Sequence, residues 1–143
     1  MKFIKSNALY IAWTTSVVAA LGSLYFSEVR NFAPCVLCWY QRICMYPLVL
    51  ISGAGILRKD KNVVSYALPL ASIGWLTSIY HNLLYYKIIP ESAAPCVSGV
   101  SCTTKFIEYF GFVSIPLLSL SSFSIILLCL WVFWKTKNSP TTV

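Results

Sequence analysis

Four long segments with very few charged side chains cover most of this chain, and they constrain its fold more than any other feature. They run over residues 8–27, 39–57, 63–86 and 112–134. The hydrocarbon core of a bilayer is roughly 30 Å thick and is crossed by about 20 apolar residues in a helix. A helix also satisfies its own backbone hydrogen bonds where no water is present. The sequence therefore predicts an all-α, polytopic membrane four-helix bundle, with residues 1–143 as a single membrane domain.

The composition agrees with a membrane protein. Hydrophobic residues make up 58% of the 143 residues, charged residues make up 10%, and the mean hydropathy is +0.73. These values are far from the usual balance of soluble proteins. Lys2 and Lys5 before the first segment resemble the start of a secretory signal, but the apolar run is longer than a signal core and no clear cleavage site follows it. We predict that this segment is retained as a span.

The net charge of +7 follows from membrane topology, because basic residues are retained on the cytoplasmic side. Seven of the eleven Lys and Arg residues lie near the termini or in the short second connection: Lys2, Lys5, Arg58, Lys59, Lys61, Lys135 and Lys137. The four spans then predict that both termini are cytoplasmic and that the outer loops cover about residues 28–38 and 87–111. We predict no nucleic-acid partner, because no basic and aromatic module accompanies the charge.

Four of the six cysteines lie in the two predicted outer loops. Cys35 and Cys38 are in the first loop, and Cys96 and Cys102 are in the second. Disulfides persist outside the cytosol, so this placement predicts dithiol or disulfide chemistry. Four cysteines allow three pairings, and proximity along the chain favours Cys35 with Cys38 and Cys96 with Cys102. The other two lie within spans and are predicted to be inert packing residues: Cys44 and Cys129.

Zinc binding and structural stapling are alternative uses of the outer cysteines. A structural zinc site takes four ligands from Cys and His. The second cysteine pair is spaced C-x5-C, and the only histidine, His81, lies within the third span. We therefore predict no metal site. A structural disulfide in each outer loop of a tetraspan protein stays open as an alternative.

Arg42 lies close to the first cysteine pair. If the second helix begins near Cys35, then Cys35, Cys38 and Arg42 fall at positions i, i+3 and i+7 and share one helical face. A helix N-terminus and a nearby cation both favour the reactive thiolate. The same guanidinium would hold a negative oxygen of a bound cofactor. Snorkelling of Arg42 to the lipid head groups is the ordinary alternative.

The stretch Cys35-Val36-Leu37-Cys38-Trp39-Tyr40-Gln41-Arg42, the four spans and the later cysteine pair together resemble the DsbB family of disulfide-bond-formation membrane proteins. That family's electron route to quinone is a known example of disulfide chemistry in the bacterial periplasm. The CWYQR ending and the short second connection look most like its smaller, BdbC-type members. The resemblance covers nearly the whole chain, and it implies a multi-pass protein of the bacterial cell membrane with its redox loops on the extracytoplasmic face.

The resemblance also implies an activity and a set of roles. It implies a quinone-linked protein thiol-disulfide oxidoreductase that uses menaquinone or ubiquinone and reoxidises a DsbA- or BdbD-like thioredoxin-fold thiol oxidase. Cys38 matches the thiol beside the quinone, and Cys35 is its disulfide partner. Arg42 matches the family's quinone-associated arginine. Cys96 matches the cysteine that forms the mixed disulfide with the partner, and Cys102 resolves it, although larger members separate this pair by a longer stretch.

His81 is the remaining candidate for cofactor binding. It lies six residues before Lys87, or about 9 Å below the outer end of the third span at about 1.5 Å per residue. That depth suits a ring donor to a quinone oxygen, and the family resemblance places a quinone-proximal histidine in this region. A histidine bonded to a neighbouring helix fits the position equally well.

Another membrane thiol enzyme, of the vitamin K epoxide reductase kind, is also similar, because it too is a four-helix bundle with a CxxC pair. In that kind of enzyme the CxxC pair follows the loop cysteines. Here Cys35 and Cys38 precede Cys96 and Cys102. The chain order therefore favours the DsbB-type interpretation.

Overall fold

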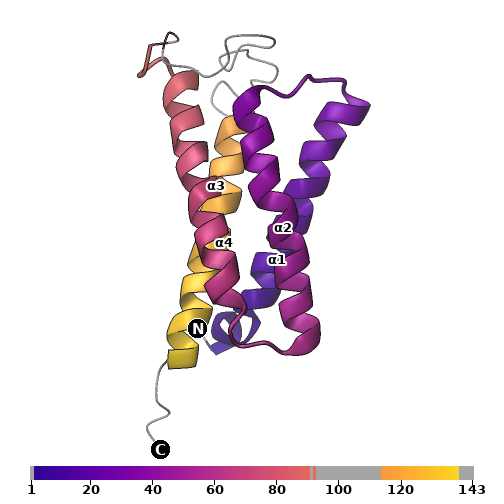
Figure 1. Cartoon of the computed structure of the whole chain (residues 1–143), viewed down its shortest axis with the longest axis vertical. Coiled ribbons are helices and arrows are strands. Elements are labelled where there is room, and N and C mark those ends of the chain that lie inside the picture. The colour runs from indigo at the N-terminus through magenta and orange to yellow at the C-terminus, as the bar shows by residue number, and fades with distance from the viewer. Residues whose placement is uncertain (1, 91, 93–113, 139–143) are drawn as a thin grey trace, which may run out of the picture.

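The computed structural model describes residues 2–90, 92 and 114–138 of the chain (Figure 1). Four long helices account for nearly all of them: α1 (Lys2–Leu24), α2 (Val36–Arg58), α3 (Val63–Tyr85) and α4 (Ile115–Asn138). A short π-helical segment, η1 (Tyr25–Val29), continues α1. The described part of the chain contains no strand, so the predicted all-α class is confirmed.

The four helices form an up-and-down bundle in which consecutive helices are antiparallel (Figure 1). Each helix packs against two neighbours, α1 against α2 and α4, and α3 against α2 and α4. The start of α1 and the end of α4 lie at one end of the bundle, together with the connection between α2 and α3 (Figure 1). The start of α2, with its cysteines, lies at the opposite end.

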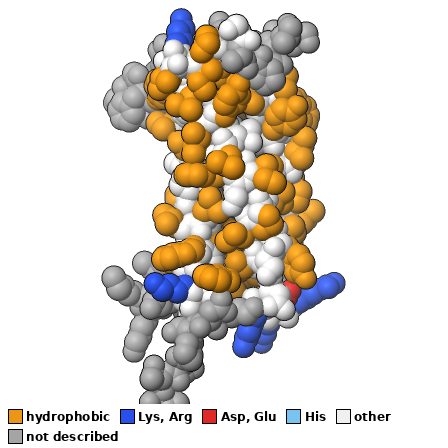
Figure 2. Space-filling view, turned by 60° about the vertical axis from the view of Figure 1, so that its left-hand side comes forward, with side chains coloured by type: hydrophobic (Ala, Val, Ile, Leu, Met, Phe, Trp, Pro, Cys, Tyr) orange, Lys and Arg blue, Asp and Glu red, His pale blue; other side chains and the backbone are white. Residues whose placement is uncertain are grey.

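The outer surface of the bundle is that of a membrane protein. Figure 2 shows hydrophobic side chains along the side of the molecule and Lys and Arg side chains at its ends. Three helical stretches are long and apolar enough to cross a bilayer: Asn7–Val29, Val63–Tyr85 and Ile115–Thr136. The second helix, α2, is not among them, since Gln41 and Arg42 lower its hydropathy. It has the same length as α1 and α3, 23 residues, and packs beside them.

Small residues in the core let the helices approach closely, as is usual where lipid surrounds a bundle. Ala12, Ala67 and Ala71 are fully buried. At Gly74 of α3, a Cβ atom would overlap the ring of Phe123 from α4. Van der Waals contact of this kind is the main attraction between helices in lipid, so the small residues fix the helix spacing.

Cys44 and Cys129 belong to the same core. Both side chains are buried, and they lie in one hydrophobic cluster with residues of all four long helices. The first cysteine pair belongs to a separate hydrophobic cluster. The position of Cys44 and Cys129 agrees with the predicted role in packing.

Candidate redox site

The connection from α1 to α2 places the first cysteine pair. Asn31 adopts a left-handed conformation with φ of 52°, which turns the chain after η1. Cys35 then serves as the N-cap of α2 in an extended conformation, and its carbonyl accepts a hydrogen bond from the N–H of Trp39 at 3.2 Å. Because α2 begins at Val36, earlier than the span predicted from residue 39, Cys38 lies in the first helical turn.

The helix start brings the two sulfurs together. The Sγ atoms of Cys35 and Cys38 are 3.0 Å apart, and both cysteines are free thiols. Cys35 is buried and Cys38 is half-buried. A disulfide bond is about 2.05 Å long with Cβ atoms about 3.8 Å apart, so the pair needs only a small movement to form one. This geometry suits repeated opening and closing of the bond.

His81 of α3 joins this pair, which the sequence alone did not show. Its Nε2 lies 3.7 Å from the Sγ of Cys35, and its Nδ1 lies 3.2 Å from the amide nitrogen of Gln41. His81 is 2% exposed and Gln41 is 7% exposed. His81 thus bonds a neighbouring helix through Gln41 of α2, as one of the two suggestions from the sequence has it, and its role as a donor to a quinone oxygen stays a prediction.

Gln41 is a site residue that sequence reasoning missed. The sequence could have identified Gln41, because a polar side chain inside a span is costly unless it has a partner. When the Gln41 amide donates to Nδ1 of His81, the ring proton must sit on Nε2 and point at the sulfur of Cys35. The hydrogen bond from Gln41 therefore sets which ring nitrogen of His81 is the donor.

Cys35 is the more acidic thiol of the pair. The hydrogen bond from the thiol of Cys38 is the largest influence, and together with the hydrogen bond from His81 it lowers the pKa of Cys35 to about 4. Burial acts in the opposite direction. Cys35 lies ahead of α2, outside the membrane-spanning helices. The negative charge of the reduced pair therefore rests on Cys35, and its stabilisation comes from Cys38 and His81 more than from Arg42.

Arg42 lies on the predicted helical face but directs its guanidinium to α1. Its Nε donates to the Oγ of Ser23 and its Nη2 donates to the carbonyl of Ser23, both at 2.8 Å. Its guanidinium carbon also lies 5.5 Å from the ring centre of Trp39. Arg42 is only 8% exposed, so the snorkelling alternative does not describe it. A buried arginine of this kind links α1 to α2 and leaves further N–H groups for another partner.

A cavity of about 330 Å³ opens beside these residues. Its wall includes Cys35, Cys38, Arg42 and His81. Most of the remaining wall is apolar and includes residues of α1, η1, α2 and α4: Ala19, Phe26, Met45, Ile115, Leu118 and Phe123. Pockets for small molecules have volumes of about 300 to 1,000 Å³ and combine apolar walls with a few polar groups. The cavity has the size and lining for a flat, lipid-soluble ring.

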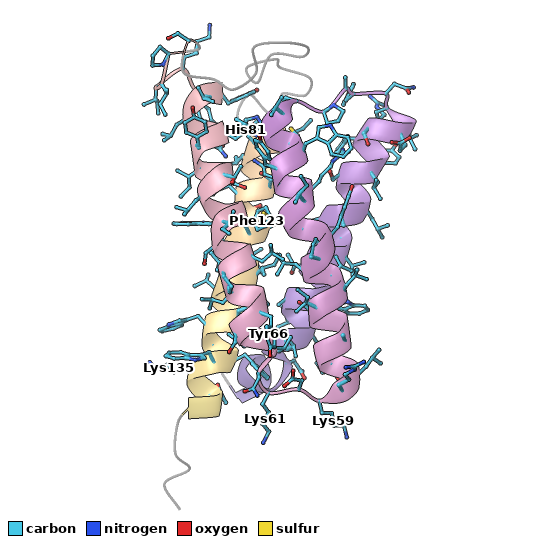
Figure 3. All side chains as sticks on the ribbon, viewed as in Figure 1. Lys59, Lys61, Tyr66, His81, Phe123 and Lys135 are labelled. Atoms are coloured by element: carbon cyan, nitrogen blue, oxygen red, sulfur yellow. The ribbon has the colours of Figure 1, made fainter. Side chains whose placement is uncertain are left out.

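The structure places these sequence-predicted residues at one end of the bundle. Figure 3 shows His81 at the end opposite Lys59, Lys61 and Lys135. The second cysteine pair, Cys96 and Cys102, lies outside the described residues.

A helical membrane bundle with a reactive dithiol in the wall of an apolar cavity defines a membrane thiol-disulfide enzyme. Comparison with known proteins makes the class specific. The chain belongs to the DsbB family, because the family model described as disulfide bond formation protein DsbB matches residues 5–134. No solved structure matches the chain.

Relatives from several bacteria support the same assignment. The chain is 50% identical over 131 residues to a probable disulfide formation protein C 1 of Bacillus anthracis, covering 91% of this chain and 94% of the relative. It is 50% identical over 130 residues to disulfide bond formation protein C of Bacillus subtilis, with the same two coverages. A probable disulfide formation protein C of Halalkalibacterium halodurans is 49% identical over 131 residues, with 92% and 96% covered.

Family membership confirms the resemblance drawn from the CVLCWYQR stretch. The chain is a disulfide formation protein of the membrane, and this implies thiol-disulfide oxidoreductase activity. In the structure, Cys35, Cys38, His81 and Arg42 line one cavity.

Proposed function

We propose that this protein reoxidises an extracytoplasmic thioredoxin-fold thiol oxidase and passes the electrons to a membrane quinone. In this way it would support disulfide formation in secreted proteins. The observation that carries the proposal is the dithiol of Cys35 and Cys38 in the wall of a largely apolar cavity of about 330 Å³. A protein substrate cannot enter such a cavity, whereas a lipid-soluble acceptor fits it.

The residues around the cavity fit a quinone. A bound quinone, menaquinone or ubiquinone, supplies an acceptor for two electrons and two protons. Arg42 donates two of its five N–H groups to Ser23, so three remain for an oxygen in the cavity. His81 lines the same cavity. The rest of the lining is mostly apolar and suits the ring and the start of an isoprenoid chain.

The chain's own residues account for the sulfur chemistry. Oxidation of the two thiols of Cys35 and Cys38 to one disulfide releases two electrons and two protons. The thiolate of Cys35 is the form that reacts. Nε2 of His81 lies 3.7 Å from that sulfur, where a donated hydrogen bond stabilises the anion. Burial of both groups excludes water from the reacting atoms.

The second cysteine pair completes the route. In the proposal, the disulfide of Cys96 and Cys102 accepts electrons from the reduced partner, with Cys96 in the mixed disulfide. A thiol of this pair then attacks the disulfide of Cys35 and Cys38 and forms a mixed disulfide with it. The other thiol of the second pair resolves the mixed disulfide, which leaves Cys35 and Cys38 reduced and restores the disulfide of Cys96 and Cys102. Five residues separate Cys96 from Cys102 in the sequence.

The charges of the bundle ends support the orientation. Lys59, Lys61 and Lys135 lie at the end opposite His81 (Figure 3). Because basic residues are retained in the cytoplasm, the redox site would face the extracytoplasmic side of a bacterial cell membrane. Both termini would then be cytoplasmic.

The test mixes the purified protein with a water-soluble ubiquinone analogue and a reduced thioredoxin-fold oxidase, and follows quinone absorbance. The unchanged protein is expected to consume quinone in proportion to the partner thiol supplied. Cys38→Ser and Cys96→Ser should each abolish this turnover, because each removes one sulfur of an essential pair.

Cys44→Ser and Cys129→Ser are the matched controls, since both cysteines are buried in the core and neither lines the cavity. They should keep most of the activity. Unchanged quinone consumption in Cys38→Ser would exclude the proposed route.

A further inference from the structure

Three side chains of the site form a set of metal ligands. The Sγ atoms of Cys35 and Cys38 and a ring nitrogen of His81 all lie within 4.8 Å of one another. Two cysteines spaced C-x2-C with one histidine are a common donor set for zinc. The position of His81 in the third span argued against a zinc site in the sequence, but the fold brings His81 next to Cys35 and Cys38.

The spacing of the donor atoms is close to what a tetrahedral ion requires. With bonds of about 2.3 Å to sulfur and about 2.0–2.1 Å to nitrogen, two sulfurs around one Zn²⁺ are about 3.8 Å apart, and a sulfur and a nitrogen are about 3.6 Å apart. Cys35 Sγ and His81 Nε2 are already 3.7 Å apart. The sulfurs, at 3.0 Å, need to separate by less than 1 Å, which a small rotation of the half-buried Cys38 side chain provides.

Gln41 fits the role of a supporting residue for a histidine ligand. Metal-bound histidines usually donate their other ring N–H to an oxygen, which orients the ring. The amide of Gln41 lies 3.2 Å from Nδ1 of His81. If the amide turns by 180°, its oxygen accepts a hydrogen bond from Nδ1, and the lone pair of Nε2 then faces the sulfurs.

The fourth coordination position faces open space. Cys35, Cys38 and His81 all line the cavity, so a water molecule or another small ligand has room there. Three protein ligands with one open position are typical of accessible zinc sites, whereas purely structural sites are closed by four.

We propose that the reduced form of this protein binds one Zn²⁺ ion through Cys35, Cys38 and His81. Both thiols lose their protons on binding, and two S–Zn bonds and one N–Zn bond form. The oxidised pair cannot bind in this way, because its two sulfurs are joined to each other and carry no charge. Metal binding and disulfide formation are therefore mutually exclusive, and Zn²⁺ holds the protein in its reduced, inactive form. The inactivation rests on the proposed function, but the binding does not.

X-ray absorption at the zinc edge tests the ligand set without any change to the site. The protein is reduced with a phosphine, carries Cys96→Ser and Cys102→Ser so that the loop thiols contribute nothing, and is loaded with one equivalent of Zn²⁺. The expected shell has two sulfurs at about 2.3 Å and an imidazole nitrogen at about 2.0–2.1 Å, with one further light atom. A shell without imidazole, or with a single sulfur, would overturn the proposal.

Affinity measurements against a chromophoric chelator give the second test. Zn²⁺ should bind the reduced protein with one ion per chain and the oxidised protein at least about 100-fold more weakly. Gln41→Leu should weaken binding by about 10- to 100-fold, the usual effect of losing a supporting residue. Cys44→Ser is the matched control and should leave the affinity unchanged. Equal affinity of the reduced and oxidised forms would refute the site.

The two proposals fail separately. Loss of quinone turnover on adding Zn²⁺, with recovery on adding a chelator, would show that Zn²⁺ binding inhibits the activity. A protein that shows the expected zinc shell but no quinone turnover would keep the metal site and exclude the proposed function. A protein that turns over quinone and binds no Zn²⁺ when reduced would keep the proposed function and exclude the metal site.

Discussion

Gly74 allows us to predict a large change in stability from the addition of one methyl group. A Cβ atom at this position of α3 would come within 3.0 Å of three ring atoms of Phe123 on α4. Phe123 is fully buried, so its ring cannot swing out into lipid. Overpacking of a core usually costs about 1–3 kcal/mol, and the full burial of the ring places Gly74→Ala at the upper end, about 3 kcal/mol. Higher helix propensity returns about 1 kcal/mol, so the net loss is about 2 kcal/mol.

Gly22 of α1 is the matched control. A Cβ atom there meets no other atom within 4 Å. Gly22→Ala should therefore show the propensity gain alone, an increase of about 0.5–1 kcal/mol in the free energy of unfolding. The two variants make the same chemical change and are expected to differ by nearly 3 kcal/mol. Reversible unfolding in mixed micelles, followed by helical circular dichroism, measures that difference.

A second substitution tests the cause. Phe123→Leu removes the ring that the new methyl group would strike, so the double variant with Gly74→Ala should be more stable than the sum of the two single changes predicts. Coupling between residues in contact is typically about 0.5–3 kcal/mol. Equal stability of Gly74→Ala and Gly22→Ala, or strictly additive effects of Gly74→Ala and Phe123→Leu, would refute the packing argument.

Two further predictions concern the site. Because the folded pKa of Cys35 is about 4, its thiolate persists down to about pH 5, and its alkylation by iodoacetamide, read by mass spectrometry, should be nearly constant between about pH 5 and pH 8. In the unfolded protein the alkylation rate should rise with pH up to about pH 9. Cys44, which unlike Cys35 does not line the cavity, should stay unmodified in the folded protein. A rate for folded Cys35 that climbs about tenfold per pH unit would contradict the lowered pKa. Arg42→Lys cannot keep both hydrogen bonds to Ser23 and should lower the free energy of unfolding by about 1–2 kcal/mol. Ser23→Ala should cause a smaller loss, because the hydrogen bond from Arg42 to the Ser23 carbonyl survives. A larger loss in Ser23→Ala than in Arg42→Lys would contradict this account of the Arg42 hydrogen bonds.

The helices were largely predictable from the sequence because lipid imposes one requirement on every span. A run of about 20 apolar residues has to be helical whatever its neighbours are. α3 begins at Val63 as predicted, and the helix boundaries elsewhere differ by a few residues where caps and aqueous loops decide them. The start of α2 at Val36 is such a case, since Cys35 completes the cap there.

The candidate site was predictable only in part. The spacing of Cys35 and Cys38 identified them as candidates, and its charge within a span identified Arg42. The residues that contact them could not be identified in this way. Ser23 lies in no distinctive motif, and Gln41 lies in the CWYQR stretch, which does not reveal its partner. The roles of both residues depend on where α1 and α3 pass α2. The sequence predicts that Arg42 favours a thiolate; its charge acts on Cys38, whereas the pKa of Cys35 is lowered by Cys38 and His81.

The sequence by itself determined that this chain crosses a membrane as helices and that it carries a redox-capable dithiol at the start of the second one. Both properties are local, because hydropathy and the i, i+3 spacing act within a single segment. Only the tertiary structure decided that His81, 43 positions after Cys38 in the chain, meets the sulfurs and that an apolar cavity opens beside them. Those features arise from the packing of four helices against one another, and contacts between distant segments are set by the complementary shapes of whole helix faces.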